Sequence, residues 1–369
     1  MEARNPHSEI QDPKSAAHLA ALRVRDFRCF DQFSCELSPG CTVFVGDNAQ
    51  GKTSLLEAVC VLLRLQSPRA TSFEDLVRFG QTGFGVSGDI GSHRLQFTYR
   101  GGKRELARDG ASIPKAADYL AGSGLLVWMG NDDLQLVRGS GDARRRYLDF
   151  LGTQAHADYR PALLNYEKAL RSRNRLLKAD PADRRQIEAY TSLLVEHGEV
   201  LTLLRGDLVR AISPWAAEAH RQVSERDETL TFCFEPGSGA DFTASLAAAR
   251  EEERRRRVTV VGPHRDDIAI LLDGSAASRF ASEGQQRTIA LALKLAQARL
   301  LENLRSTPPL LLIDDIFGEL DPTRRNALLR VLPSGTQQLI TATHLDWLDR
   351  GFIPQRIYAV RDGALVSQT

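Results

Sequence analysis

Apolar residues follow different patterns along the chain, and each pattern predicts a different kind of element. Short continuous apolar runs are typical of strands buried on both faces, and they occupy residues 41–45, 258–261, 310–313 and 339–343. Residues 84–114 instead alternate between apolar and polar, with hairpin turns at Gly101-Gly102 and Asp109-Gly110. That alternation predicts an antiparallel patch.

Several further β-prone segments surround these runs. Residues 22–47 predict two short strands, and the second leads through a glycine-bearing loop into an apolar helix at 54–65. Strands are also expected at 230–234 and 268–272, and a final hairpin turns at Asp362-Gly363. Strands and helices therefore alternate at both ends of the chain, which predicts an α/β protein.

The pattern changes to a helical period between Asp142 and Glu225. Asp180-Pro181 has the N-cap residue and first-position proline of a helix start. The helix that follows carries apolar residues at alternating a and d positions, and we expect Pro214 to break or kink it. This segment predicts an antiparallel helical hairpin inserted into the α/β fold.

The order of these patterns predicts one α/β domain in two parts. We expect a disordered leader at 1–18, the first α/β part at 19–141, the helical hairpin at 142–228 and the second α/β part at 229–369. None of the apolar runs reaches the ~18 residues that a membrane span needs, so no membrane partner is expected. Five cysteines without a CxxC pair argue against a disulfide framework or a zinc site and favour a cytoplasmic protein.

Charge is balanced overall but clustered locally. Lysine and arginine number 48 and the acidic residues 47, so the formal net charge is +1 and a uniformly basic coat is excluded. An anionic partner must therefore meet a local basic patch. The candidate clusters are Arg144–Arg146, the alternating Arg171, Arg173 and Arg175, and Arg254–Arg257.

The strongest chemical motif is a P-loop, the glycine-rich loop that wraps a phosphate chain. It comprises Gly46, Asp47, Asn48, Ala49, Gln50, Gly51, Lys52 and Thr53, with Ser54 directly behind it. Its backbone N–H groups face the phosphates, Lys52 reaches the β- and γ-phosphates, and the Thr53 hydroxyl binds Mg²⁺. An apolar strand before the loop and an apolar helix after it are the context that this motif requires. The motif predicts binding of ATP with Mg²⁺.

A P-loop needs a partner carboxylate, and the apolar run at 310–313 supplies two. Asp314 and Asp315 follow directly, so they emerge at the carboxyl end of a buried strand. We expect Asp314 to hold Mg²⁺ through water and Asp315 to orient or deprotonate the water that attacks the γ-phosphate.

Ser282-Glu283-Gly284-Gln285-Gln286 opens a predicted helix and resembles the signature motif of the ABC-type ATPases. In that family this helix end caps the γ-phosphate that a second subunit binds. The resemblance therefore implies that Ser282, Gly284 and Gln285 contact the nucleotide of a partner, and that the protein forms a homodimer around ATP.

Two more segments resemble ABC-type motifs. Residues 318–321 resemble the D-loop, although Gly318 replaces the usual serine, and His344 follows a strand where the family has its switch histidine. The alternative for His344 is an ordinary surface histidine. Gln135 is the nearest candidate for the family's Q-loop glutamine.

Four stretches narrow the resemblance to the RecF family of bacterial recombination proteins, which are related to the SMC proteins. They are residues 22–30 (LRVRDFRCF), 133–149 (DLQLVRGSGDARRRYLD), 262–267 (GPHRDD) and 282–293 (SEGQQRTIALAL). Asn131 departs from the family's usual proline, and the polar leader is a second departure. The resemblance implies an ABC-type ATPase head with a mixed sheet, an antiparallel β patch and a helical insertion.

The resemblance also implies a function in recombinational repair. The expected activity is a weak, DNA-stimulated ATPase whose hydrolysis acts as a release timer. The expected partners are duplex DNA near single-strand gaps, RecO and RecR, and indirectly RecA.

The sequence leaves two questions open. The arginine clusters either contact DNA or pair with neighbouring acidic residues, since each of Glu251, Glu252 and Glu253 has an arginine four residues on. The protein could also be a transporter ATPase subunit or the head of an SMC-like or nuclease complex. A transporter subunit would require a clear Q-loop glutamine, which the sequence does not show. An SMC-like or nuclease head would require a long coiled coil or a separate acidic metal cluster, and neither is evident in the sequence.

Overall fold

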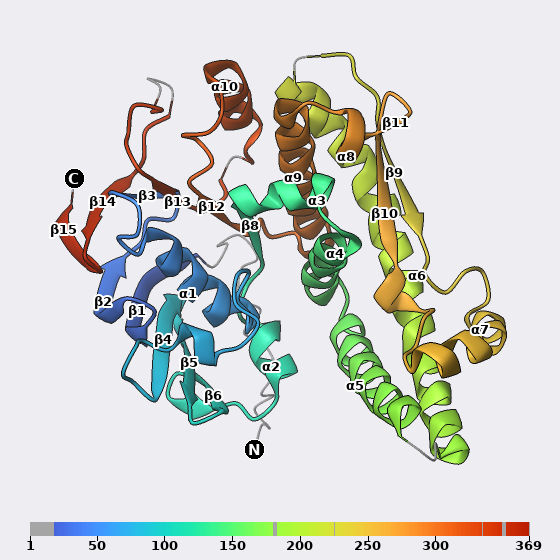
Figure 1. Cartoon of the computed structure of the whole chain (residues 1–369). Helices are drawn as coiled ribbons and strands as arrows, with labels where there is room; N and C mark the ends of the chain where they lie inside the picture. Colours follow the sequence, from blue (N-terminus) through green and yellow to red (C-terminus); the bar gives the residue numbers. More distant parts are fainter. Residues whose placement is uncertain (1–17, 180–182, 225, 334, 349–351, 369) are drawn as a thin grey trace, which may run out of the picture.

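A six-stranded, mainly parallel sheet forms the centre of the fold (Figure 1). Its order is β15-β14-β3-β13-β12-β8, made by β15 (Ala364–Gln368), β14 (Arg356–Arg361), β3 (Cys41–Val45), β13 (Gln338–Ala342), β12 (Leu310–Asp314) and β8 (Leu126–Gly130). Only β15 is antiparallel to its neighbour. Leu312 faces one hydrophobic core and Ile313 the other, which explains why these strands are apolar throughout.

The computed structural model describes residues 18–179, 183–224, 226–333, 335–348 and 352–368. All of the predicted leader except His18 lies outside these residues, as does the predicted helix start at Asp180-Pro181. The described helix begins at Arg184, and the Asp183 carboxylate accepts a hydrogen bond from the Gln186 N–H at 3.0 Å.

The antiparallel patch predicted at 84–114 is confirmed as part of a second sheet, which β1 and β2 extend and whose order is β2-β1-β4-β5-β6-β7. Its strands are β2 (Phe30–Glu36), β1 (Leu19–Phe27), β4 (Gly83–Ile90), β5 (His93–Arg100), β6 (Lys103–Arg108) and β7 (Ala111–Ser112). The prediction of two strands within 22–47 is wrong, because β2, β3 and most of β1 occupy that stretch. Asp26 and Arg28 adopt left-handed backbone conformations that turn β1 into β2. Helix α1 (Lys52–Arg64) packs between the two sheets.

The helical segment consists of α4 (Gly141–Ala155), α5 (Tyr159–Lys178) and α6 (Arg184–Ser224). The α5–α6 hairpin is as predicted, but Pro214 does not break α6, which runs for 41 residues. Ile212 and Ala216 are fully buried on either side of the exposed proline, so packing holds the helix through the missing hydrogen bond.

A third sheet, β11-β10-β9, lies against α6. It contains β9 (Leu230–Glu235), β10 (Asp267–Leu272) and β11 (Ser275–Ala276), and α7 (Phe242–Arg256) lies between β9 and β10 in the chain. The strand predicted at 258–261 does not form. The Thr259 N–H instead donates to Asn174 Oδ1 at 2.8 Å and the Val260 N–H to Glu253 Oε1 at 3.2 Å, so side chains take the place of a neighbouring strand.

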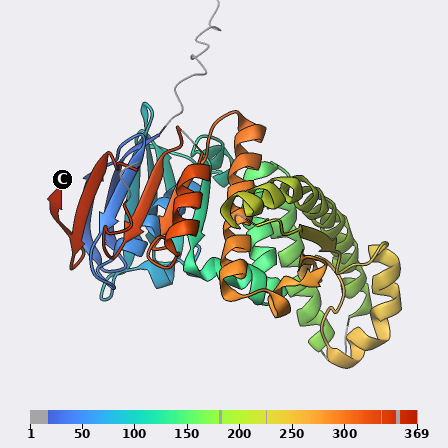
Figure 2. The same ribbon diagram turned by 90° about the horizontal axis from the view of Figure 1, so that it is seen from above.

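Helix α9 (Glu283–Arg305) lies between the two halves of the molecule (Figure 2). The two large sheets occupy one side of it and α5, α6 and α7 the other. The remaining elements are η1 (Glu74–Leu76), α2 (Ala116–Ala121), η2 (Asn131–Asp133), α3 (Leu134–Arg138), η3 (Pro263–Arg265), α8 (Ala277–Phe280) and α10 (Pro322–Val331). Across the described residues, every helix is too short or too polar to cross a membrane.

Candidate nucleotide-binding site

The P-loop joins the carboxyl end of β3 to the first turn of α1, as predicted. Gly51 is the N-cap of α1 and has φ +100°. A Cβ atom there would lie 2.7 Å from Cys29 Sγ and 2.8 Å from Phe30 Cζ. Only glycine combines this backbone conformation with such close packing, so the β1–β2 turn fixes the shape of the loop.

Lys52 is folded against its own loop. Its ammonium Nζ donates to the carbonyl oxygens of Gly46 at 2.6 Å and Asp47 at 2.7 Å. Burial lowers the pKa of Lys52, although Asp315, Asp314 and Asp47 counteract that effect. None of the ion pairs among the described residues includes Lys52, so its charge is available to an anion in the loop.

Asp314 lies at the end of β12, beside the P-loop. Its Oδ1 accepts hydrogen bonds from the hydroxyls of Thr53, at 2.8 Å, and Thr341, at 2.7 Å. Burial raises the pKa of Asp314, and the two hydroxyls only partly oppose that rise. A carboxylate and a hydroxyl in contact are hard oxygen donors of the kind that Mg²⁺ takes from P-loop proteins, so these residues fit the ion.

Asp315 has a left-handed backbone with φ 52°, which turns the chain out of β12. Its N–H donates to Thr341 O at 3.2 Å and Thr341 Oγ1 at 3.0 Å, so β13 holds this turn in place. Burial raises the pKa of Asp315, Lys52 lowers it and Asp314 raises it further. Asp315 therefore has the raised basicity that suits a group accepting a proton from water.

Gly51, Lys52, Thr53 and Asp315 line a cavity of about 590 Å³, and Asp314 is bonded to its lining through Thr53. Six of the residues that line the cavity were not predicted from the sequence: Arg28, Cys29, Arg69, Asp75, Val77 and Phe79. Arg28 donates to both oxygens of the fully buried Glu57 at 2.9 Å, and Phe79 is entirely exposed at the rim. Arg28 belongs to the family-like stretch 22–30, but no spacing rule connects it to a loop that follows β3.

The signature-like segment does not line this cavity. Ser282 is the N-cap of α9, and it forms a reciprocal pair of hydrogen bonds with Gln285, at 2.7 and 3.3 Å. A Cβ atom on Gly284 would lie 2.5 Å from the Arg324 guanidinium. Gly284 opens instead on a separate hollow of about 270 Å³, whose lining includes Glu319 and Asp321 of the D-loop-like segment.

Three other predicted residues have contacts outside the phosphate loop. The side-chain oxygen of Gln50 accepts from the Asp362 N–H at 2.6 Å, which ties the loop to the last hairpin. His344 is half exposed with its Nδ1 3.5 Å from Asp346, and no described contact connects it to Asp315. Gln135 is exposed on α3 and does not line the cavity.

The arginine clusters mostly form ion pairs within the chain. Arg144 binds Asp267, Arg145 binds Asp142, and Arg254 and Arg256 bind Glu251 and Glu252. Glu253 does not pair with the arginine four residues on. It points inward to Arg173, which is 3% exposed, while Arg171 and Arg175 face solvent.

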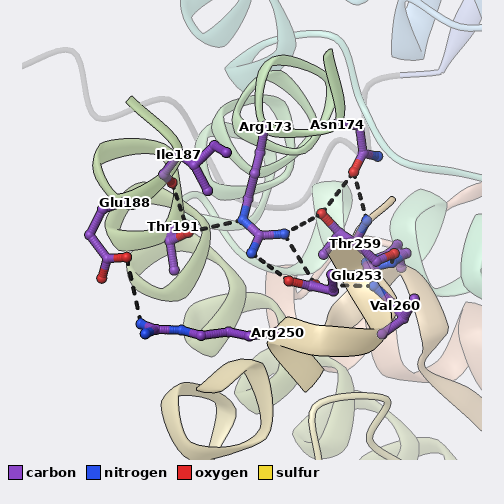
Figure 3. A network of polar contacts seen from close by, with 10 residues as sticks. Arg173, Asn174, Ile187, Glu188, Thr191, Arg250, Glu253, Thr259 and Val260 are labelled. Atoms are coloured by element: carbon purple, nitrogen blue, oxygen red, sulfur yellow. Dashed lines mark hydrogen bonds and ion pairs between the residues drawn. The ribbon is translucent and has the colours of Figure 1, made fainter. Parts of the chain in front are cut away.

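Figure 3 shows the network around Arg173. Its guanidinium donates to both Glu253 oxygens at 3.1 and 2.6 Å, to Thr259 at 2.7 Å and to Thr191 at 2.9 Å. These contacts join α5, α6, α7 and the segment after α7. A guanidinium that is buried and fully bonded in this way has a structural role.

Comparison with known proteins agrees with this geometry. Residues 21–231 match the family model described as an AAA domain. The chain is a P-loop ATPase with an ABC-type fold, and SMC head domains share that fold with a TM-score of 0.55 at 15% identity over 95% of this chain.

Proteins with higher sequence identity to this chain show which family of these ATPases it belongs to. The chain is 37% identical over 94% of its length to the DNA replication and repair protein RecF of Synechococcus sp. (strain JA-2-3B'a(2-13)), covering 97% of that protein. It is 38% identical over 95% of its length to RecF of Symbiobacterium thermophilum, covering 98% of it. The solved structure titled recombination mediator protein RecF-ATP in the RecFOR pathway has a TM-score of 0.86 at 26% identity and covers 97% of this chain and 100% of that one. The chain belongs to the RecF family of DNA replication and repair proteins.

Proposed function

We propose that the chain binds Mg·ATP in the cavity between the P-loop and β12. The observation that carries this proposal is the 2.8 Å hydrogen bond between the Thr53 hydroxyl and the Asp314 carboxylate, formed beside Lys52. Lys52 meets the β- and γ-phosphates, and Thr53 and Asp314 hold Mg²⁺. The bound ion neutralises charge on the phosphates.

Hydrolysis to ADP and phosphate then needs a group that positions water. Asp315 suits this role because it lines the cavity and its pKa is raised by burial. His344 is a second candidate, which would have to turn from Asp346 toward the nucleotide. Neither residue is needed for ATP to bind.

The signature segment supports a shared site. Ser282, Gly284 and Gln285 lie outside the cavity that holds Lys52, so one chain supplies only half of the contacts that an ABC-type site uses. Two chains arranged head to tail around two ATP molecules complete both halves. With the domain boundaries that we propose near 142 and 229, α9 and its partner-facing end belong to the second α/β part.

The dimer acts in recombinational repair. We infer that it binds duplex DNA near single-strand gaps, works with RecO and RecR, and so helps RecA to load. ATP hydrolysis reopens the dimer and serves as a release timer, which requires only a slow, DNA-stimulated turnover. The cytoplasm is the compartment in which these partners meet.

Light scattering with and without ATP and duplex DNA tests the shared site. Ser282→Arg places bulk at the anion-facing end of α9 and removes its capping oxygen. We expect normal ATP binding by the monomer, because Lys52, Thr53 and Asp314 are intact, together with loss of dimerisation and hydrolysis. Normal dimerisation and hydrolysis by this variant would contradict the shared site.

Mixing provides a control for misfolding. Ser282→Arg mixed with Lys52→Met rebuilds one composite site per heterodimer, from the intact P-loop of one chain and the intact signature of the other. Partial recovery of ATPase activity supports the model. Ser282→Ala, which removes only the hydroxyl, should weaken dimerisation less than the arginine variant.

A further inference from the structure

Four arginines that are far apart in sequence act on one another's charge near the end of the central sheet opposite the P-loop, since Arg160 and Arg305 lower the pKa of Arg64 and Arg104 lowers the pKa of Arg160. They are Arg64 at the end of α1, Arg104 on β6, Arg160 in the first turn of α5 and Arg305 at the end of α9. None of them belongs to the arginine clusters that the sequence displays. We call them the edge arginines.

Backbone contacts fix the position of Arg64, and β6 reaches the segment before β8, since Arg108 Nη2 on β6 donates to Asp118 O at 3.4 Å. Arg64 Nη1 donates to Gly124 O at 3.2 Å, and the next residue, Leu125, accepts a hydrogen bond from the N–H of Leu310 at 2.9 Å. Residues 124 and 310 adjoin the amino ends of the parallel strands β8 and β12. The nucleotide cavity lies at the carboxyl ends, because Asp315 directly follows β12.

The same guanidinium also contacts the junction of α4 and α5. Arg64 Nη2 donates to Thr153 O at 3.2 Å. Gly152 packs so tightly against Tyr159 that a Cβ atom there would lie 2.3 Å from the ring. Arg160 follows Tyr159 directly and therefore lies at this junction. Arg305 is the last residue of α9 and comes five residues before the start of β12.

The edge arginines repel one another without a compensating carboxylate. Burial, with a smaller contribution from the charges of Arg160 and Arg305, lowers the pKa of Arg64 to about 10, although Cys60 opposes this effect. Burial also lowers the pKa of Arg160, with Arg104 adding to that effect. Among the ion pairs of the described residues none includes any of the four, and the nearby Asp158 and Glu302 do not pair with them either.

The positive charge of Arg64 is not balanced by any carboxylate of the described residues within hydrogen-bonding distance. Arg64 is 3% exposed, its two Nη atoms have only carbonyl acceptors, and its Nε has no partner. A buried cation without a carboxylate is costly to the fold. Arg104 and Arg305 are exposed, so an anion from solvent can approach the group and supply the missing charge.

We propose that the edge arginines bind the phosphate backbone of duplex DNA. Guanidinium groups match phosphate oxygens with paired hydrogen bonds. Phe79 and Phe280 are the exposed aromatic side chains among the large apolar residues of the described chain, and neither lies on α1, β6, α5 or α9. The group therefore suits phosphate contact on a duplex rather than base stacking on a single strand.

This inference rests on the proposed function, and it adds the position at which duplex DNA binds to the protein. In a head-to-tail dimer the carboxyl edge of the sheet faces the nucleotide and the partner chain, so the opposite edge stays open. DNA at this edge would contact the first α/β part through β6 and the helical segment through α5. DNA binding would then depend on the position of the helical segment relative to the first α/β part.

Fluorescence anisotropy with a labelled 30-base-pair duplex tests the proposal, in a non-hydrolysable ATP analogue and at several salt concentrations. The triple variant Arg104→Gln, Arg160→Gln and Arg305→Gln leaves the buried Arg64 in place. Loss of three phosphate contacts should make the log–log salt slope shallower by about 3 and weaken binding roughly 100-fold near 0.1 M salt. The matched control replaces the exposed Arg171, Arg175 and Arg255 by Gln, removes the same charge, and should bind as wild type.

ATP-analogue affinity, measured in parallel, should be unchanged in both triple variants and shows that they are folded. Wild-type DNA binding by the edge variant overturns the proposal, and so does an equal loss in both variants. If the wild-type protein itself binds no duplex with the analogue present, the proposed DNA function fails and takes this inference with it.

Discussion

Two regions of the molecule bury charged side chains, and they treat them in opposite ways. In the helical region Arg205 bonds to Asp149 at 2.7 Å and to Asp266 at 2.9 Å, and its Nε donates to Tyr159 at 2.9 Å. At the nucleotide edge Lys52 has only carbonyl acceptors, and Asp314 has only hydroxyl donors.

The difference separates structural charges from functional ones. A guanidinium whose N–H groups face carboxylates inside the protein gains nothing from an external ligand. At the nucleotide edge the Lys52 ammonium forms no ion pair, and burial raises the pKa of the Asp314 carboxylate. Mg·ATP would stabilise both groups, because it brings an anion to Lys52 and a cation to Asp314. Substitutions in the two regions should therefore have separable effects on stability and on binding.

The largest effect should come from breaking the structural network. Arg173→Met leaves the Glu253 carboxylate buried and unpaired, which should lower the free energy of unfolding by about 3–5 kcal/mol. Urea denaturation measures this loss, and ATP binding by the remaining folded protein should be unchanged.

Two variants control this result. Arg171→Met lies on the same helix but is exposed, so it should change stability by less than about 0.5 kcal/mol. The double variant Arg173→Met with Glu253→Met removes both charges and should recover much of the stability that the single variant loses. A single variant as stable as wild type would mean that the network is dispensable.

Lys52→Met should show the reverse pattern. Nucleotide affinity should fall by about 3 kcal/mol, or more than 100-fold, because charge-assisted hydrogen bonds to the phosphates are lost. Stability without nucleotide should stay the same or rise, since a desolvated ammonium is removed. Isothermal titration with Mg·ATP and urea denaturation measure the two effects. ATP-dependent dimerisation should be lost as well, and retained affinity would remove the P-loop from the mechanism.

Asp315→Asn tests whether Asp314 serves to bind Mg·ATP while Asp315 serves to position the attacking water. Mg·ATP should still bind through Asp314, but weaker positioning of water should slow turnover roughly 100-fold. The dimer on DNA should then last longer, which dissociation kinetics after dilution can measure. Turnover at the wild-type rate would assign water activation to another group, of which His344 is the next candidate.

The comparison also explains what the sequence could predict. The P-loop is contiguous, and its chemistry lies largely in the backbone, so a pattern of glycines with Lys52 and Thr53 is sufficient to predict it. Asp314 was predictable because an apolar strand that ends in acids carries them to the same edge. The family resemblance likewise predicted the fold class and the helical insertion.

The arginines were harder to interpret because their role depends on distant partners. Arg173 belongs to an exposed-looking run, yet its partner Glu253 is 80 positions away. The edge arginines form no run at all, since four separate elements bring them together. The strand predicted at 258–261 failed for the same reason, because Asn174 and Glu253 bind its N–H groups. Local pattern carries no information about such contacts.

The smallest effect should be a gain in stability at the nucleotide edge. Burial raises the pKa of Asp314, so the native state holds its charged form unfavourably. Asp314→Asn keeps an oxygen that can accept from Thr53 and Thr341, and without nucleotide or Mg²⁺ it should stabilise the fold by about 1 kcal/mol at pH 7. A group whose pKa is raised on folding destabilises the native state fully above the folded pKa, and this penalty disappears as the pH falls through that pKa toward the unfolded value. The advantage of the variant over wild type should therefore shrink on acidification, as paired thermal denaturation in EDTA from pH 7 downward can measure. The same variant should lose Mg·ATP binding, so it gains stability while losing function. An Asp314→Asn variant that is less stable than wild type at pH 7 would place Asp314 with the structural charges and remove the contrast between the two regions.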